Sequence, residues 1–273
     1  LYRCFCEPGI DNVVICPPTY GMYQVSADIN NIEVRKAPLL DDFQLNLAHI
    51  EQLIDANTKI IWLCSPNNPT GNALNRVDVE MVLNNFNGIV VIDEAYINFS
   101  KQQSFTKDLS EYPNVVILQT FSKAWGLAGL RLGMAFASEA IITIMNRVKP
   151  PYNINQVTQE LALQALEEVG QVNDMIRELV DMRAALAEVI ITIPGVEKVY
   201  DSDANFILVK VDQAKALYDF FITKGIVVRD RSNVQLLENC LRITIGTEQE
   251  NTLLVDAWAA WVTATYQLDA FEN

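Results

Sequence analysis

The feature that most constrains the fold is the regular return of short, uninterrupted apolar runs in the first half of the sequence. These runs, rich in β-branched side chains, occupy residues 13–16, 59–64, 88–92 and 115–119. Strands that are buried on both faces have this continuous apolar pattern. Helical patterns lie between them, at residues 20–30, 47–56 and 78–86. The alternation predicts an α/β fold with a mostly parallel sheet and helices on both faces.

The pattern changes near Lys149, where two prolines are followed by a long helical segment at residues 156–190. Further along the chain we expect strands and helices in an α+β arrangement. The strands are expected at residues 206–211, 226–229 and 241–245, and the helices at 213–224 and from about 248. We therefore predict a large domain, residues 1–153, and a smaller α+β domain, residues 154–273, that begins with a long inter-domain helix.

Charge and apolar content exclude several classes of partner. The formal charge of −14 has the wrong sign for a protein that neutralises a nucleic-acid backbone. The apolar stretches are shorter than the ~18–20 residues of a membrane-spanning helix. With no leader at the N-terminus and five cysteines that form no disulfide framework, we expect a soluble protein of the cytoplasm, with neither nucleic acid nor membrane as a partner.

The chain has a single histidine, His49, and this limits its chemistry. A Ser-His-Asp or Cys-His nucleophile would have to use His49, which lies in a mixed polar and apolar segment typical of a surface helix. A Cys/His metal site lacks ligands for the same reason, so no metal is expected.

Polar residues follow three of the predicted strands. These segments are Ser-Pro-Asn-Asn-Pro-Thr-Gly at residues 65–71, Asp-Glu-Ala-Tyr at residues 93–96, and a Ser-Lys-Ala segment with several glycines at residues 120–131. Open parallel sheets bind their ligands beyond the carboxyl ends of the strands, so these segments are the candidate site.

Taken singly, these residues leave alternatives open. An acid such as Asp93 at a strand end also occurs in nucleotide triphosphatases, but none of the eleven glycines belongs to a phosphate-binding loop with the required Lys-Ser/Thr ending. Lys123 could be a surface lysine. Its neighbours Thr120, Ser122 and Arg131 are, however, the hydroxyls and guanidinium that suit a phosphate, and a lysine that forms a Schiff base needs such an anchor for its cofactor.

Together, the three segments resemble those of the fold-type I aminotransferases that use pyridoxal 5′-phosphate, and more narrowly the histidinol-phosphate aminotransferases. The resemblance covers nearly the whole chain, from Glu-Pro-Gly at residues 7–9 and Cys-Pro-Pro-Thr-Tyr-Gly-Met-Tyr at residues 16–23 to Cys-Leu-Arg-Ile-Thr-Ile-Gly-Thr at residues 240–247. It implies a large cofactor-binding domain and a smaller C-terminal domain.

The resemblance also implies residue roles. Lys123 would form the Schiff base with the cofactor and move the proton, and Asp93 would keep the pyridine nitrogen protonated so that the ring accepts electrons. The other implied cofactor contacts are Asn68 and Tyr96 to the 3′-oxygen, Tyr20 against the ring face, and Thr120, Ser122 and Arg131 to the phosphate. Tyr96 is expected to be catalytic together with Lys123 and Asp93.

Two arginines are expected to bind the substrate. Arg242 matches the family's carboxylate-binding arginine, and Arg229 ends the predicted strand thirteen residues earlier. Two guanidiniums suit a phosphate dianion better than one carboxylate, although Arg229 could instead pair with Asp230. The implied reaction is transamination between L-histidinol phosphate and 2-oxoglutarate, giving imidazole-acetol phosphate and L-glutamate, in histidine biosynthesis.

Other interpretations remain. The chain could be an aromatic or other amino-acid aminotransferase of the same fold, a decarboxylase of a phosphorylated amino acid, a non-catalytic module that binds pyridoxal phosphate, or an inert fragment. Family members carry a further N-terminal stretch with a helix start at the cofactor phosphate, an arm over the substrate and a tyrosine that reaches the neighbouring subunit, and these 273 residues do not contain it. The resemblance implies a homodimer.

Overall fold

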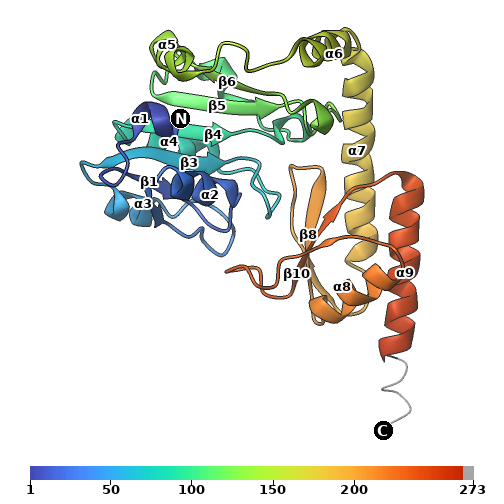
Figure 1. The fold of residues 1–273 in the computed structure, drawn as a ribbon. Helices are drawn as coiled ribbons and strands as arrows, with labels where there is room; N and C mark the ends of the chain where they lie inside the picture. The colour runs from blue at the N-terminus through green and yellow to red at the C-terminus, as the bar shows by residue number, and fades with distance from the viewer. Residues whose placement is uncertain (267–273) are drawn as a thin grey trace.

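Two β-sheets form the framework of the chain, each covered by helices (Figure 1). The computed structural model describes residues 1–266. The first sheet has six strands in the order β2-β1-β3-β4-β5-β6, parallel except for the antiparallel edge strand β6. Its strands are β1 (Asn12–Ile15), β2 (Glu33–Lys36), β3 (Thr58–Cys64), β4 (Ile89–Asp93), β5 (Val115–Thr120) and β6 (Gly133–Ala137). The predicted α/β fold with a mostly parallel sheet is confirmed.

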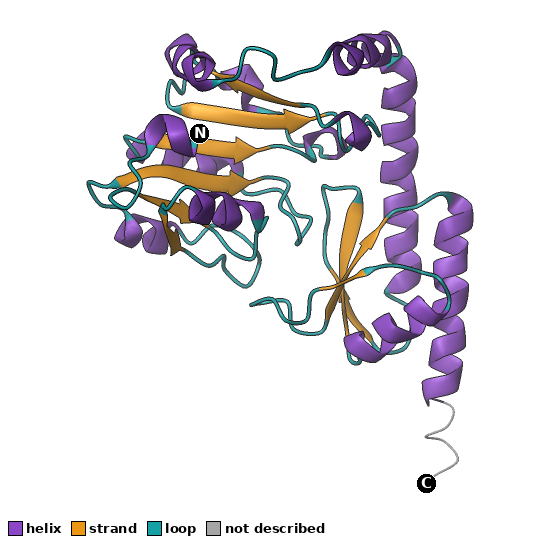
Figure 2. Cartoon of the chain, in the orientation of Figure 1, coloured by secondary structure: helices purple, strands orange, loops and turns teal. Residues whose placement is uncertain are grey.

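Helices cover both faces of the first sheet, as predicted (Figure 2). On one face, α3 and α4 bury Ile50, Val79 and Leu83 against the strands. On the other face, α1, α2 and α5 contribute Tyr2, Tyr23 and Ile141. The helices are α1 (Tyr2–Phe5), α2 (Met22–Ile29), α3 (Leu47–Leu53), α4 (Arg76–Asn85) and α5 (Glu139–Val148), with 3₁₀ turns at η1 (Ile97–Phe99), η2 (Phe105–Asp108) and η3 (Ala128–Leu130).

The second sheet has four antiparallel strands in the order β7-β8-β10-β9. Helices α7, α8 and α9 pack on one of its faces around the fully buried Trp258. These elements are α6 (Gln156–Glu167), α7 (Val169–Ile190), β7 (Val196–Val199), β8 (Phe206–Val211), α8 (Ala214–Thr223), β9 (Arg229–Asp230), β10 (Cys240–Thr244) and α9 (Glu248–Tyr266). None of the helices described in residues 1–266 is both long and apolar enough to span a membrane.

Two sequence predictions need correction, and three strands were missed. The helix expected at residues 156–190 is two helices, because the chain leaves helical geometry at Glu168, and Figure 1 shows α6 and α7 meeting at a steep angle. The strand expected at residues 226–229 lies further along the chain, as β9 (Arg229–Asp230). Strands β2, β6 and β7 were not predicted. The proposed domain division falls between α5 and α6 and stays a prediction.

The architecture brings the candidate segments together. Strands β3, β4 and β5 are neighbours, with Cys64 in register with Asp93 and Asp93 with Leu118. Their carboxyl ends therefore lie side by side, and Figure 1 shows this edge of the first sheet facing the second sheet.

Candidate active site

The turn after β3 presents Asn68. Asn67 is fully buried and fixes this turn through its side-chain nitrogen, which donates to Pro18 O at 2.8 Å and to Thr70 Oγ1 at 2.7 Å. Gly71 closes the turn with φ +90°, and a Cβ there would lie 2.7 Å from Ser202 Oγ, so only glycine fits. The side-chain oxygen of Asn68 accepts a 2.6 Å hydrogen bond from Arg242 Nη1 of the second sheet.

Asp93 ends β4 with both carboxylate oxygens bound. Oδ2 accepts a 2.7 Å hydrogen bond from Tyr23 Oη, and Oδ1 accepts one of 3.1 Å from the backbone nitrogen of Ala95. Burial raises the pKa of Asp93, and these two hydrogen bonds together with Lys123 counteract the rise. The site therefore contains a desolvated carboxylate that is held in one orientation.

Lys123 lies in the turn after β5, close enough to Asp93 for the carboxylate charge to affect the pKa of the lysine. Thr120 Oγ1 accepts a 3.0 Å hydrogen bond from Ser122 N, and Gly126, with φ +66°, returns the chain by donating its backbone nitrogen to Lys123 O. Lys123 Nζ is 5.2 Å from the centre of the Tyr96 ring. Burial lowers the pKa of Lys123, and the positive charges of Arg242 and Arg131 add to that effect. A lowered pKa favours the neutral amine that can act as a nucleophile.

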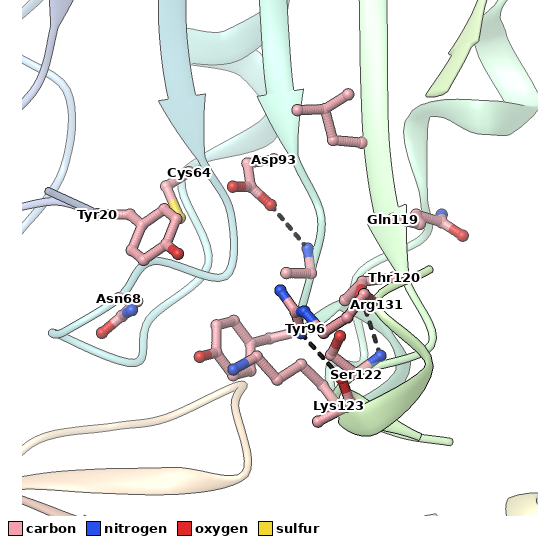
Figure 3. Close-up of a pocket in the computed structure, with 13 residues that line it drawn as sticks. Tyr20, Cys64, Asn68, Asp93, Tyr96, Gln119, Thr120, Ser122, Lys123 and Arg131 are labelled. Carbon is pink, nitrogen blue, oxygen red and sulfur yellow. Dashed lines mark hydrogen bonds between the residues drawn. The ribbon is translucent and has the colours of Figure 1, made fainter. Parts of the chain in front are cut away.

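One cavity of 410 Å³ gathers the predicted cofactor residues (Figure 3). Those that line it are Tyr20, Asn68, Asp93, Tyr96, Thr120, Ser122, Lys123 and Arg131. Arg131 adopts the left-handed conformation, with φ +52°, and its Nη1 donates to Ala128 O at 2.9 Å. Arg131 is otherwise exposed to the cavity, beside the hydroxyls of Thr120 and Ser122.

The donor set of this cavity fits pyridoxal phosphate. It combines a lysine amine of lowered pKa, an oriented carboxylate for the pyridine nitrogen, a 43% exposed Tyr20 ring, and a hydroxyl and guanidinium group for the phosphate. Tyr96, whose pKa burial raises to about 12, is a neutral phenol that can donate a hydrogen bond to an anionic oxygen. The bond from Arg242 engages the oxygen of Asn68, which leaves its amide nitrogen as a donor.

A second cavity, of 660 Å³, lies beside the first and shares Tyr20, Asn68, Tyr96 and Lys123 with it. Arg229 and Arg242 both line it, as predicted, and Arg242 also lies 4.9 Å over the Phe206 ring. Among residues 1–266, no carboxylate lies within ion-pair distance of Arg229, so its alternative pairing with Asp230 is not formed.

The structure adds residues that the sequence did not indicate. Tyr23 donates to Asp93, Arg231 lines the second cavity, and Cys64 and Gln119 line the first. Arg231 could have been found from side-chain alternation, because it lies two residues after Arg229 in an extended segment. Tyr23 is 70 residues from Asp93, and no local pattern indicates that contact.

Comparison with known proteins places this site in a family. The family model "Aminotransferase class I and II" matches residues 1–257. The chain is 54% identical over 255 residues to a histidinol-phosphate aminotransferase of Flavobacterium psychrophilum, and 51% identical over 255 residues to that of Flavobacterium johnsoniae. In each case the alignment covers 93% of this chain and 73% of the relative.

Solved structures agree on the fold. The histidinol-phosphate aminotransferase of Clostridium acetobutylicum superposes with a TM-score of 0.87 at 23% identity, over 93% of this chain and 79% of that one. The Sinorhizobium meliloti histidinol-phosphate aminotransferase, solved in complex with pyridoxal 5′-phosphate, gives 0.87 at 22% identity, over 96% of this chain and 73% of that one. The chain is an aminotransferase and belongs to the class I and II aminotransferase family.

Proposed function

We propose that the chain uses pyridoxal 5′-phosphate to transfer an amino group between L-histidinol phosphate and 2-oxoglutarate, giving imidazole-acetol phosphate and L-glutamate. The observation that carries this proposal is that two neighbouring cavities share Lys123, one lined by Asp93 and Arg131 and the other by Arg229 and Arg242. Histidinol-phosphate aminotransferases at 49–54% identity support the choice of substrate.

The residues would divide the work as follows. When bound, pyridoxal phosphate supplies an aldehyde and an electron-accepting ring. Lys123 would hold it through Nζ and, when released, move a proton to and from the substrate carbon. Asp93 would keep the pyridine nitrogen protonated, since the hydrogen bonds from Tyr23 and Ala95 favour the ionised carboxylate against the rise in pKa that burial causes.

The other first-cavity residues would bind and orient. Tyr20 would pack against the ring face, while Asn68 and Tyr96 would donate to the 3′-oxygen. Thr120, Ser122 and Arg131 would hold the phosphate, the hydroxyls by hydrogen bonds and the guanidinium by charge. Arg229 and Arg242 would bind the substrate. Arg242 would also bind the carboxylate of glutamate in the other half-reaction.

The proposal includes a compartment and an oligomeric state for the chain. All five cysteines are free thiols, which supports a reducing compartment such as the cytoplasm. The resemblance of the site to the family supports a homodimer. Size-exclusion chromatography with light scattering measures the oligomeric state, and an active enzyme that is a monomer would contradict the proposed homodimer.

Absorption spectroscopy tests the cofactor and the first half-reaction together. With pyridoxal phosphate added, we expect a band near ~420 nm that moves to ~330 nm when L-histidinol phosphate is added. Lys123→Ala should abolish the ~420 nm band, whereas Lys101→Ala, which removes an exposed lysine outside both cavities, should keep it. A band that survives in Lys123→Ala would remove Lys123 from its proposed role.

Substrate profiling separates this function from its neighbours on the same fold. We expect L-histidinol phosphate to have a higher kcat/KM than phenylalanine, tyrosine or aspartate. A structural relative at 25% identity is the L-threonine-O-3-phosphate decarboxylase of Porphyromonas gingivalis, with a TM-score of 0.79. Faster turnover of an aromatic amino acid, or carbon dioxide released from L-threonine O-3-phosphate, would replace the proposed substrate.

A further inference from the structure

Three arginines lie on one face of the second sheet. In the antiparallel pairing of β9 with β10, Arg229 lies directly opposite Arg242. Arg231 continues that pairing, because its backbone nitrogen donates to Cys240 O at 2.8 Å. Side chains alternate between the faces of a strand, so Arg229, Arg231 and Arg242 share a face and Asp230 lies on the other. All three arginines line the 660 Å³ cavity next to Lys123.

This cluster of positive charge is not neutralised within the described chain. No carboxylate of residues 1–266 forms an ion pair with any of the three guanidiniums. The Nε atoms of Arg231 and Arg242 are buried without a hydrogen-bond partner. Like charges that face each other across strands are destabilising, and buried polar atoms without partners are rare in native proteins. Such an arrangement is stabilised when an anion binds between the guanidiniums.

Arg231 has the donors to bind that anion. Arg242 already uses one Nη to hold Asn68, and Arg229 is exposed to solvent. Arg231 is half-buried, and burial lowers its pKa; the charge of Arg229 adds to that effect, and Asp230 on the other face of the strand counteracts part of it. A guanidinium with free donors binds the oxygens of a phosphate in a planar, two-bond arrangement.

We propose that Arg231 is a third substrate-binding arginine, which binds the phosphate of the amino donor and makes the cavity selective for a phosphomonoester dianion over an uncharged alcohol. This inference rests on the proposed function, and it assigns a specificity residue that neither the motif nor the comparisons indicate. Phosphomonoesters are dianions at neutral pH, since their second pKa is ~6.

Steady-state kinetics on the cofactor-loaded enzyme test it. Arg231→Gln should lower kcat/KM for L-histidinol phosphate about 10- to 100-fold, mostly through KM, because one hydrogen-bonded charge contact is lost. The value for L-histidinol, which lacks the phosphate, should change less than about threefold. Arg231→Lys should recover part of the loss. Arg177→Gln removes an exposed arginine of α7 and should match the wild type.

Phosphate binding gives a readout that does not depend on turnover. Calorimetric titration of the cofactor-loaded chain with inorganic phosphate should show about tenfold weaker binding in Arg231→Gln than in Arg177→Gln. The thermal midpoint without phosphate should stay unchanged or rise, because a like-charge contact is removed. A lowered midpoint, equal losses with both alcohols, or unchanged phosphate binding would each overturn the role of Arg231.

The two proposals can fail separately. If wild-type enzyme does not turn over L-histidinol phosphate but loses phosphate affinity in Arg231→Gln, the proposed substrate is wrong and the anion site stands. If the cofactor does not load, the phosphate titration is run on the cofactor-free chain. Only a loss of phosphate affinity in Arg231→Gln that is absent from Arg177→Gln then supports the anion site. Turnover of L-histidinol phosphate that is insensitive to Arg231→Gln would keep the proposed function and remove this inference.

Discussion

Replacing Tyr23 by phenylalanine removes one hydroxyl from the residue that orients Asp93. The Tyr23 ring is 4% exposed and stacks on Trp62 at 4.8 Å, and a phenylalanine ring retains that packing. What is lost is the 2.7 Å hydrogen bond to Asp93 Oδ2. Hydrogen bonds to charged groups contribute about 1.5–3 kcal/mol, so we expect the free energy of unfolding to fall by about that amount.

A second tyrosine provides the matched control. Tyr2 contacts the same Trp62, at 5.5 Å, and donates a 2.8 Å hydrogen bond to the backbone oxygen of Tyr23, which carries no net charge. Tyr2→Phe should therefore cost only about 1 kcal/mol. Urea unfolding of the cofactor-free chain, followed by tryptophan fluorescence, measures both losses.

The pH dependence has a defined sign. The Tyr23 hydroxyl stabilises the ionised form of Asp93, whose pKa burial raises. Its contribution is therefore present above the pKa of Asp93 and is lost as the pH falls through that value. The cost of Tyr23→Phe should be larger at about pH 8 than at about pH 4, because the raised pKa of Asp93 makes this carboxyl take up its proton at a higher pH than an ordinary aspartate does. The cost of Tyr2→Phe should differ little between these conditions.

A double-mutant cycle with Asp93→Ala isolates the pair. We expect a coupling energy of about 1.5–3 kcal/mol between Tyr23 and Asp93, since each single change removes the same hydrogen bond. A coupling energy near zero, or a Tyr23→Phe cost no larger than that of Tyr2→Phe, would refute the claim that this hydroxyl holds a charged carboxylate.

Three further changes have defined outcomes. Burial is the largest cause of the lowered pKa of Lys123, and the charge of Arg242 is the next, so Arg242→Gln should raise that pKa. The measurement is reductive trapping of free pyridoxal on Lys123 across a pH series, and its midpoint should move to higher pH. Glu94→Ala removes the acceptor of three hydrogen bonds, from Ser104 Oγ, Gln119 Nε2 and the buried backbone nitrogen of Phe105, and should cost about 3 kcal/mol in urea unfolding, against at most ~0.5 kcal/mol for the exposed Glu111→Ala. Trp258→Ala empties the second-sheet core and should cost about 3–5 kcal/mol by the same assay.

The interior of the fold could be predicted from the sequence, but its edges could not. Strands β1, β3, β4 and β5 lie inside the first sheet and have continuous apolar runs, which burial on both faces requires. Strands β2, β6 and β7 are edge strands. β2 reads Glu-Val-Arg-Lys and β7 reads Val-Glu-Lys-Val. Charged residues are common on edges, and they hide a strand from a search for apolar runs.

The candidate site was likewise predictable where it lies on interior strands and was missed in part where it lies on an edge strand. Residues just after the interior strands could be selected from the sequence, because the carboxyl ends of parallel strands meet at one edge. All eight predicted cofactor residues line one cavity, although their roles stay proposals. Arg231 was missed because the strand was expected at residues 226–229, and Arg231 lies beyond the end of that expected strand. A strand placed at Arg229–Asp230 puts Arg231 on the same face as Arg229.

The segment around Asp203 connects the two sheets. Its carboxylate accepts hydrogen bonds from Ser100 Oγ at 2.9 Å and from Ala73 N at 3.2 Å, and its backbone nitrogen donates to Gly71 O at 2.7 Å. The residues proposed to hold the cofactor come from the first sheet and its loops, while the three arginines come from the second. The contacts of Asp203 therefore help to set the spacing between Lys123 and the arginines, together with the hydrogen bond from Arg242 to Asn68. A substitution of Asp203 would therefore change the distance between Lys123 and the arginines without changing a residue that lines either cavity.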